Sequence, residues 1–223
     1  MTEVSEIREL ARKLNLMNIA NGVIDIDNEI ISNKEYLYKI LEQEINIRYQ
    51  NKIKELKSDS HLPNKTFDHS KITKGLDWQL DRIKQFDFKN NNQNIIIVGE
   101  CSSGKTALAA EIGNAMILKE AKVKYVTIDN LLFIKKAKPR QWNMILKSDC
   151  IIIDEVFYIT PTYEELLETY RTLIFLSETR SIVLITNRNL SEWKDMKVDA
   201  HLVETLKARL MSDAQLIHLK NNN

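Results

Sequence analysis

The chain has 223 residues and a mass of 26.0 kDa, which suits one full domain with a smaller appendage and excludes two large domains. Lysine and arginine number 32 against 31 for aspartate and glutamate, so the net charge of +1 excludes a chain-wide attraction to polyanions, and any nucleic-acid surface must be local. Charged residues make up 28% and hydrophobic residues 43% of the chain, a balance typical of a folded protein with a buried core.

Cysteine usage and the apolar runs indicate the compartment. The only two cysteines, Cys101 and Cys150, are far apart in the sequence, so neither a disulfide framework nor a zinc site is indicated. The first residues carry acids and no signal-peptide core, and no apolar run approaches the roughly 18 residues needed to span a bilayer. We therefore expect a cytoplasmic protein with no membrane partner.

The first part of the chain is predicted to be helical. Apolar residues recur at helical spacing over 4–14, which predicts a short first helix. Ser32 and Glu35 form a capping-box signature, and apolar residues then repeat every four positions over 37–53. This pattern predicts a helix of about six turns.

A domain boundary is predicted where this helix ends. The helix is expected to stop at Ser58-Asp59-Ser60 and Pro63, and residues 61–75 are polar and lack a clear period. We therefore predict a helical N-terminal domain over 1–65 that contacts partners or DNA, and a second domain over 66–223.

From residue 94 the pattern changes to short β-branched runs separated by helices, which is typical of a parallel sheet with helices on both faces. Asp129 is expected to cap the helix that carries Leu131, and Thr162 with Glu165 to cap the helix after Pro161. The predicted strands are 95–98, 125–128, 150–153, 181–186 and 215–219, and two further helices are predicted at 105–118 and near 200–210.

A phosphate-binding motif lies between the first predicted strand and its helix. Residues 99–106 read Gly-Glu-Cys-Ser-Ser-Gly-Lys-Thr and fit the P-loop pattern G-x-x-x-x-G-K-[ST]. Backbone N–H groups of such a loop converge on phosphate oxygens, Lys105 neutralises phosphate charge, and Thr106 offers its hydroxyl to Mg²⁺. The predicted nucleotide-binding residues are Gly99, Glu100, Cys101, Ser102, Ser103, Gly104, Lys105, Thr106 and Ala107.

Two carboxylates follow the third predicted strand. Asp154 and Glu155 are expected at the carboxyl edge of the sheet, where open α/β folds bind ligands. Asp154, with Thr106, suits Mg²⁺, and Glu155 suits a general base that polarises an attacking water. Asn187 ends the fourth predicted strand and is a candidate to contact the γ-phosphate or that water; a plain turn residue is an equal interpretation.

The order of these motifs resembles that of IstB-like ATPases, which belong with DnaC-type helicase loaders in the AAA+ initiator clade. The resemblance rests on the P-loop as Walker A at 99–106, Ile-Ile-Ile-Asp-Glu at 151–155 as Walker B, Ile-Thr-Asn at 185–187, Leu-Ser-Glu-Trp at 190–193 and Leu-Lys-Ala-Arg-Leu at 206–210. It implies an α/β fold: a three-layer P-loop AAA+ core with a parallel sheet, no C-terminal lid, preceded by the small helical N-terminal domain.

The resemblance also implies residue roles. Asn187 corresponds to the sensor 1 position, and Arg209 to an arginine finger that reaches the ATP of a neighbouring subunit. An arginine acting in trans implies a homo-oligomer, either a ring or a helical filament. Arginine fingers are worth about 10³ to 10⁵ in rate where they have been removed.

The function implied is a Mg²⁺-dependent ATPase that assembles with ATP on DNA and recruits or regulates a transposase. A replicative helicase loader, with a helicase as partner, is the alternative. A small-molecule P-loop kinase and a nucleotide-responsive scaffold without turnover stay open from the residues alone, whereas the Asn-Lys-x-Asp string of a GTPase does not occur.

A basic cluster is the candidate DNA contact. Lys135, Lys136, Lys138 and Arg140 lie within six residues of one another, after the second helix of the core. Such a cluster can bind phosphates of single- or double-stranded DNA, although a run of charges is also an ordinary solvated face. Repetition of the cluster along an oligomer would raise its avidity for DNA.

Overall fold

In a computed structural model, the structure describes residues 4–24, 33–71, 76–88, 90–196, 198–212 and 214–219. The chain divides into two compact units, 1–55 and 56–223. The division falls inside a helix, earlier than the boundary between 65 and 66 that the loss of helical period predicts.

The first unit is helical, as the apolar spacing predicts. It contains α1 (Val4–Lys13), α2 (Met17–Ala20) and the start of α3 (Asn33–Ser60). Its small core is formed by apolar side chains of these helices and of the turn after α2: Ala11, Ile19, Ala20, Ile24 and Ile40. The predicted cap residue Ser32 lies outside the described residues.

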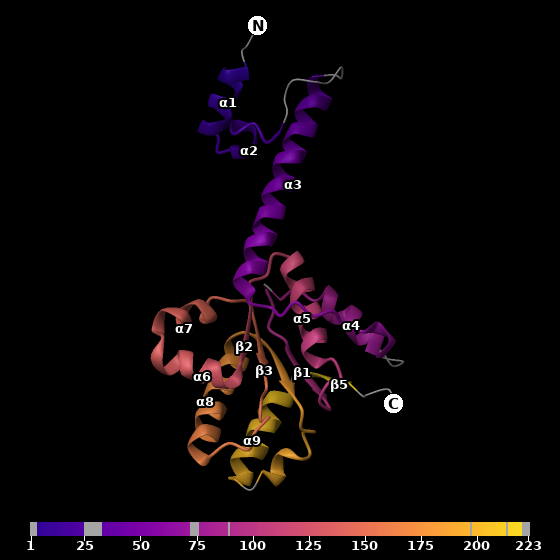
Figure 1. Cartoon of the computed structure of the whole chain (residues 1–223), viewed down its shortest axis with the longest axis vertical. Coiled ribbons are helices and arrows are strands. Elements are labelled where there is room, and N and C mark those ends of the chain that lie inside the picture. The colour runs from indigo at the N-terminus through magenta and orange to yellow at the C-terminus, as the bar shows by residue number, and fades with distance from the viewer. Residues whose placement is uncertain are drawn as a thin grey trace. The chain divides into compact units, whose positions relative to one another are not determined.

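The second unit is built on a five-stranded parallel sheet in the order β2-β3-β4-β1-β5. Figure 1 labels β2, β3, β1 and β5. Its strands are β1 (Asn94–Gly99), β2 (Val123–Thr127), β3 (Cys150–Asp154), β4 (Ser181–Thr186) and β5 (Ala214–Leu219). The central strands are buried on both faces, which accounts for their uninterrupted β-branched sequences.

Helices cover both faces of this sheet. Alternate strand residues such as Ile96 and Ile151 belong to one large core that also contains side chains of the helices α6 (Ile128–Ala137), α8 (Tyr163–Thr179) and α9 (Ala200–Met211). The helix α5 (Lys105–Leu118) lies on the other face, where Gly113 approaches Ile152, and α4 (Leu76–Gln85) packs against α5 (Figure 1). The predicted three-layer α/β core is therefore confirmed.

Of the two helix N-caps predicted in this unit, one is confirmed and one is wrong. The capping box before α8 is confirmed: Thr162 Oγ1 accepts from the Glu165 N–H, and Glu165 Oε2 accepts from the Thr162 N–H. The predicted cap at Asp129 is wrong, because Thr127 caps α6 by accepting from the Asn130 N–H. Ile128 consequently begins the helix and does not end β2.

Other elements were not predicted from the sequence. They are α2, α4, the helix α7 (Pro139–Leu146), and the short 3-10 helices η1 (His69–Lys71) and η2 (Trp193–Asp195).

Among the described residues, no helix is both long enough and apolar enough to cross a bilayer.

Candidate functional site

The loop that joins β1 to α5 is shaped to surround a phosphate. Ser102 and Gly104 adopt left-handed backbone, with φ of 64° and 96°, on either side of Ser103. A loop whose backbone alternates in this way turns successive N–H groups toward one point, where an anion binds. The Ser103 hydroxyl is fully buried and finds no hydrogen-bond partner among the described residues, so a ligand can supply one.

Lys105 begins α5 and folds back over this loop. Its side chain is buried, and its Nζ donates a hydrogen bond of 2.6 Å to the backbone carbonyl of Glu100. Burial lowers the pKa of Lys105, while the charges of Cys101, Asp154 and Glu100 act in the opposite direction. The amine thus lies across the loop, where phosphate oxygens can replace the carbonyl as its partner.

Thr106 and Asp154 meet at the carboxyl edge of the sheet. Asp154 ends β3 and is buried, and its Oδ2 accepts a hydrogen bond of 2.8 Å from the Thr106 hydroxyl. Its Oδ1 accepts the backbone N–H of Glu155 at 2.7 Å. The two residues predicted to hold Mg²⁺ are therefore adjacent, and the carboxylate is fixed at both oxygens.

Tyr125 is a site residue that the sequence did not reveal. Its hydroxyl donates to Asp154 Oδ2 at 2.7 Å, so this oxygen serves two donors. Burial raises the pKa of the Tyr125 phenol, and the hydrogen bond to Asp154 and the charges of Asp154 and Glu155 raise it further. The phenol therefore stays protonated and remains a donor.

Glu155, directly after Asp154, has a strained backbone conformation. Its φ is 62°, a left-handed value that is uncommon for a residue other than glycine and is found at functional sites. The next residue, Val156, donates its N–H to the Ile185 carbonyl at 3.0 Å, which ties the end of β3 to β4. Glu155 is exposed and lines a cavity of about 390 Å³, so water has access to its carboxylate.

Asn187 reaches the phosphate-binding loop. It lies directly after β4, and its side-chain Nδ2 contacts Cys101 Sγ at 3.9 Å. Cys101 is an exposed cysteine in the loop. The side-chain amide of Asn187 therefore lies beside the loop, and its contact with a phosphate or with water stays a prediction.

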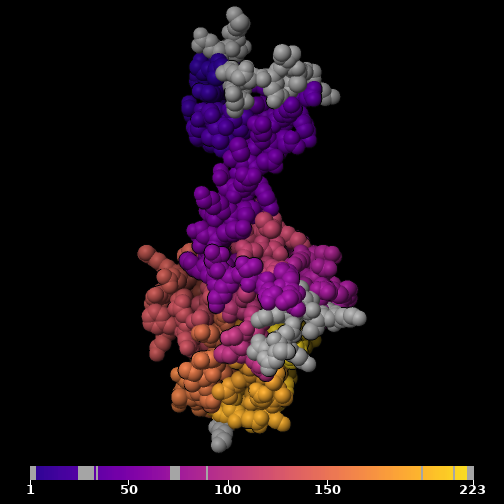
Figure 2. All heavy atoms as spheres, turned by 45° about the vertical axis from the view of Figure 1, so that its right-hand side comes forward, coloured from indigo at the N-terminus to yellow at the C-terminus, as the bar shows by residue number. Residues whose placement is uncertain are grey.

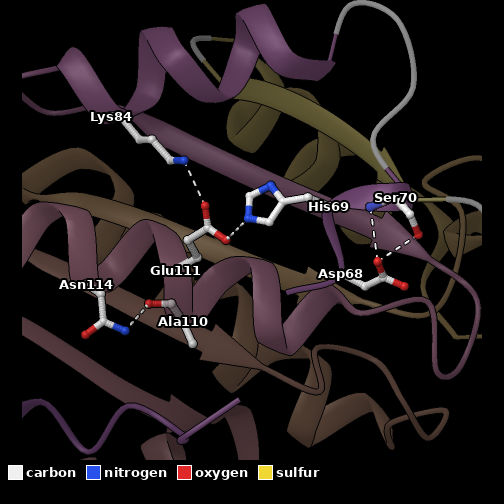
Figure 3. Close-up of polar contacts among 7 residues, drawn as sticks. All are labelled: Asp68, His69, Ser70, Lys84, Ala110, Glu111 and Asn114. Atoms are coloured by element: carbon white, nitrogen blue, oxygen red, sulfur yellow. Dashed lines mark hydrogen bonds and ion pairs between the residues drawn. The ribbon is translucent and has the colours of Figure 1, made fainter. Parts of the chain in front are cut away.

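A segment before the sheet also packs on the loop. The Phe67 ring lies so close to Gly104 that a Cβ there would be 3.3 Å from it, and it stacks edge-on against His69. His69 is paired at 3.1 Å with Glu111 of α5, which also binds Lys84 of α4 at 2.8 Å (Figure 3). Two elements outside the motif are therefore anchored to the P-loop helix.

Arg209 does not join this group. It lies in the last turn of α9, is about half exposed, and pairs with Glu178 at 3.7 Å. It lines a cavity of about 800 Å³ together with Asn94, the first residue of β1, whereas the phosphate-binding loop follows the last residue of that strand. Along a strand of this length the two ends are about 17 Å apart.

The basic cluster lies at the end of α6 and the start of α7. In Figure 2 this part of the chain has the colour that the bar gives for residues near 140. Lys135 already has partners within the protein, because its Nζ donates to Glu168 Oε1 at 2.6 Å and to Thr172 Oγ1 at 3.0 Å. Lys136, Lys138 and Arg140 are exposed. These three residues carry the charge that the cluster offers to solvent.

The residues present fit a nucleoside triphosphate with a divalent cation. The left-handed loop, the unpaired Ser103 hydroxyl and the amine of Lys105 together form a cradle for phosphates. Among the described residues, no three or more His, Cys, Asp or Glu side chains converge as a metal cage. A cation here would take most ligands from phosphate and water, as Mg²⁺ does, with Thr106 and Asp154 beside it.

The fold and this site define a P-loop AAA+ ATP-binding protein. The chain belongs to the family of IstB-like ATP-binding proteins, whose pattern matches residues 9–223. It is 27% identical over 200 residues to a Pseudomonas aeruginosa protein named for insertion sequence IS21 as its ATP-binding protein, covering 85% of this chain and 76% of that one.

Two solved structures share the fold. The DnaC helicase loader superposes with a TM-score of 0.53 at 14% identity, covering 75% of this chain and 99% of that one. The replication initiator DnaA, solved with an ATP analogue and single-stranded DNA, gives a TM-score of 0.54 at 19% identity, covering 73% of this chain and 52% of that one. At these identities the likeness establishes the fold.

Proposed function

We propose that this chain is a Mg²⁺-dependent ATPase that assembles with ATP on DNA and acts as a transposition helper. The observation that carries the proposal is the contact between Thr106 of the P-loop and Asp154 of Walker B, with Glu155 directly after it in strained backbone. The insertion-sequence name of the relative supports the role in transposition.

The roles in hydrolysis follow from these positions. The P-loop N–H groups and Lys105 bind the phosphates, and Thr106 and Asp154 orient the cation. Mg²⁺, when bound, neutralises charge on the β- and γ-phosphates. Glu155 accepts a proton from the attacking water, and Asn187 orients that water or the γ-phosphate.

Arg209 acts on a neighbouring subunit in this proposal. Its place near the start of β1 keeps it away from the chain's own loop, and its exposure leaves it accessible to a second copy. Assembly would then complete each site with an arginine from the next subunit, so turnover would depend on the oligomer.

DNA is the proposed scaffold for assembly, with the exposed Lys136, Lys138 and Arg140 binding phosphates. A nucleic-acid partner also fits the AAA+ neighbour that was solved with single-stranded DNA. The charges lie on one small surface, so each subunit would bind weakly and the oligomer would bind through many linked contacts.

A helicase loader is the second candidate, because the DnaC loader has this fold. Pull-down with the tagged full chain separates the two: recovery of a transposase supports the helper, and recovery of a replicative helicase supports the loader. If the protein were a kinase, it would transfer phosphate to an added acceptor. If it were a scaffold without turnover, Glu155→Gln would leave its nucleotide-dependent behaviour unchanged.

The direct test combines negative-stain microscopy with an ATPase assay, with and without duplex DNA and a non-hydrolysable ATP analogue. Rings or filaments that need both nucleotide and DNA, together with DNA-stimulated hydrolysis, are expected. Monomers that ignore DNA would contradict the proposal.

A further inference from the structure

Tyr125 lies between the metal-binding carboxylate and the outer edge of the sheet. It belongs to β2, which is an edge strand, and its hydroxyl donates to Asp154 Oδ2 at 2.7 Å. The same oxygen accepts from Thr106, so the position of the phenol helps to decide how the carboxylate faces the cation. Nothing in the P-loop or Walker B motifs requires this tyrosine.

Tyr125 is also among the residues that line a second cavity, at the edge of the sheet. This cavity of about 370 Å³ lies beside β2 and is walled by α6 and α7; we name it the β2-edge pocket. None of its lining residues carries a carboxylate, and three carry or can accept a positive charge. The lining residues are His61, Lys124, Tyr125, Val126, Asn130, Ile134, Lys138, Gln141, Met144 and Ile145.

The polar lining suits a phosphodiester strand. The Lys124 amine donates to the Asp59 backbone carbonyl, and Lys138 lies 5.1 Å from the centre of the Phe133 ring. Both partners are uncharged, so neither contact pairs a lysine with a carboxylate. Amide groups of Asn130 and Gln141 add hydrogen-bonding capacity for sugar, phosphate or base atoms.

We propose that Tyr125 is a positioning residue that couples a nucleic-acid strand in the β2-edge pocket to the metal-binding carboxylate of Asp154. A strand packed against the Tyr125 ring holds the hydroxyl on Oδ2 and fixes the carboxylate beside the cation. This inference rests on the proposed function, because it takes DNA as the activating ligand.

The coupling between the β2-edge pocket and the nucleotide site can be measured as a change in binding affinity. If DNA raises the affinity for the Mg²⁺-bound nucleotide by some factor, the nucleotide must raise the affinity for DNA by the same factor. Couplings between sites commonly amount to about 5- to 150-fold. The factor can be obtained from binding alone, without hydrolysis.

The experiment compares wild type, Tyr125→Phe and Tyr170→Phe. Tyr170 is a partly buried tyrosine on α8 that packs against the core, and it serves as the matched control because its substitution also removes one tyrosine hydroxyl. A fluorescent non-hydrolysable ATP analogue with Mg²⁺ is titrated with and without a short oligonucleotide, and a labelled oligonucleotide is titrated with and without the analogue.

Wild type and Tyr170→Phe are expected to show a coupling of about 5-fold or more, equal in both directions. Tyr125→Phe should bind the oligonucleotide within about 2-fold of wild type, while its coupling falls below about 2-fold. Lys138→Gln, which changes the pocket and leaves Tyr125 in place, should weaken oligonucleotide binding and lower its dependence on salt. If Tyr125→Phe does not fold, Lys138→Gln tests the coupling as well: a strand held less firmly in the pocket should couple to the nucleotide more weakly than in wild type.

Each contrary outcome has a distinct meaning. Coupling in Tyr125→Phe equal to that of wild type would overturn the role of Tyr125 and leave the proposed function standing. Equal coupling produced by inorganic phosphate or a mononucleotide in place of the oligonucleotide would overturn the strand as occupant. Absence of oligonucleotide binding by wild type in every nucleotide state would overturn the proposed function itself.

Discussion

A Cβ atom on Gly99 would lie 2.4 Å from the carbonyl oxygen of Leu219 and 2.8 Å from the Ser103 hydroxyl. Gly99 ends β1 and pairs with Leu219, the end of the neighbouring strand β5. The first glycine of the phosphate-binding motif is therefore required by the close approach of β5 as well as by the loop. The last strand of the sheet thus helps to set the shape of the nucleotide site.

Gly99→Ala is expected to destabilise the protein by about 1–3 kcal/mol, because the added methyl group must displace backbone. Thermal or urea denaturation measures this loss, and nucleotide binding should weaken with it because the loop shifts. Ser191→Ala, at an exposed position, is the control and should stay within about 0.5 kcal/mol of wild type. Equal stability of the two variants would contradict the close approach.

Glu155→Gln should bind ATP and assemble but hydrolyse it about 10² to 10⁴ times more slowly, because an amide cannot accept the proton of the attacking water. Phosphate release measures the rate, and binding of a fluorescent nucleotide shows that the site is intact. Glu165→Gln is the matched control, since Glu165 lines the same cavity from α8. An unchanged rate in Glu155→Gln would remove this residue from the role of base.

The strands and the motif residues were predictable because their signals are local. Buried parallel strands appear as β-branched runs, and the P-loop and Walker B carboxylates adjoin such runs in the sequence. The strands are all parallel, so their carboxyl ends lie at one edge of the sheet, which is why Thr106 and Asp154 meet although 48 residues separate them. Pattern and topology together were sufficient for this part of the site.

Contacts between distant side chains could not be predicted in the same way. Tyr125 appeared in the sequence only as part of a strand, and its bond to Asp154 depends on how two strands pair. Phe67 belongs to a segment without a period, and its position over Gly104 depends on tertiary packing. The pairing of Lys135 with Glu168 likewise joins two helices that the sequence places apart.

Removing the exposed charges of the basic cluster should weaken DNA binding and reduce its dependence on salt. Changing Lys136, Lys138 and Arg140 together to Gln removes up to three phosphate contacts, and each one lost lowers the slope of log affinity against log salt by about 1. Fluorescence anisotropy over a range of salt concentrations measures this slope.

Two controls make this measurement specific. Lys194→Gln, an exposed charge in η2, should leave the slope unchanged. Lys135→Gln should also change it little, because Lys135 is already paired with Glu168. A triple variant with the slope of wild type would show that DNA binds elsewhere.

Two inactive variants should restore activity when mixed, if Arg209 acts on a neighbouring subunit. Arg209→Ala keeps its own nucleotide site but lacks the arginine, whereas Lys105→Ala keeps the arginine but lacks a competent site because its buried amine is gone. In a mixed oligomer, Lys105→Ala subunits supply Arg209 to the intact sites of the other variant.

The ATPase rate is measured for each variant alone and at several mixing ratios in the presence of DNA. Each variant alone should be slower than wild type by about 10³-fold or more, given the usual worth of an arginine finger and the need for a bound nucleotide. The mixture should recover a rate that passes through a maximum at an intermediate ratio, since a productive site needs one subunit of each kind. Fully active Arg209→Ala protein, or a mixture no faster than its components, would show that Arg209 does not complete a neighbouring site.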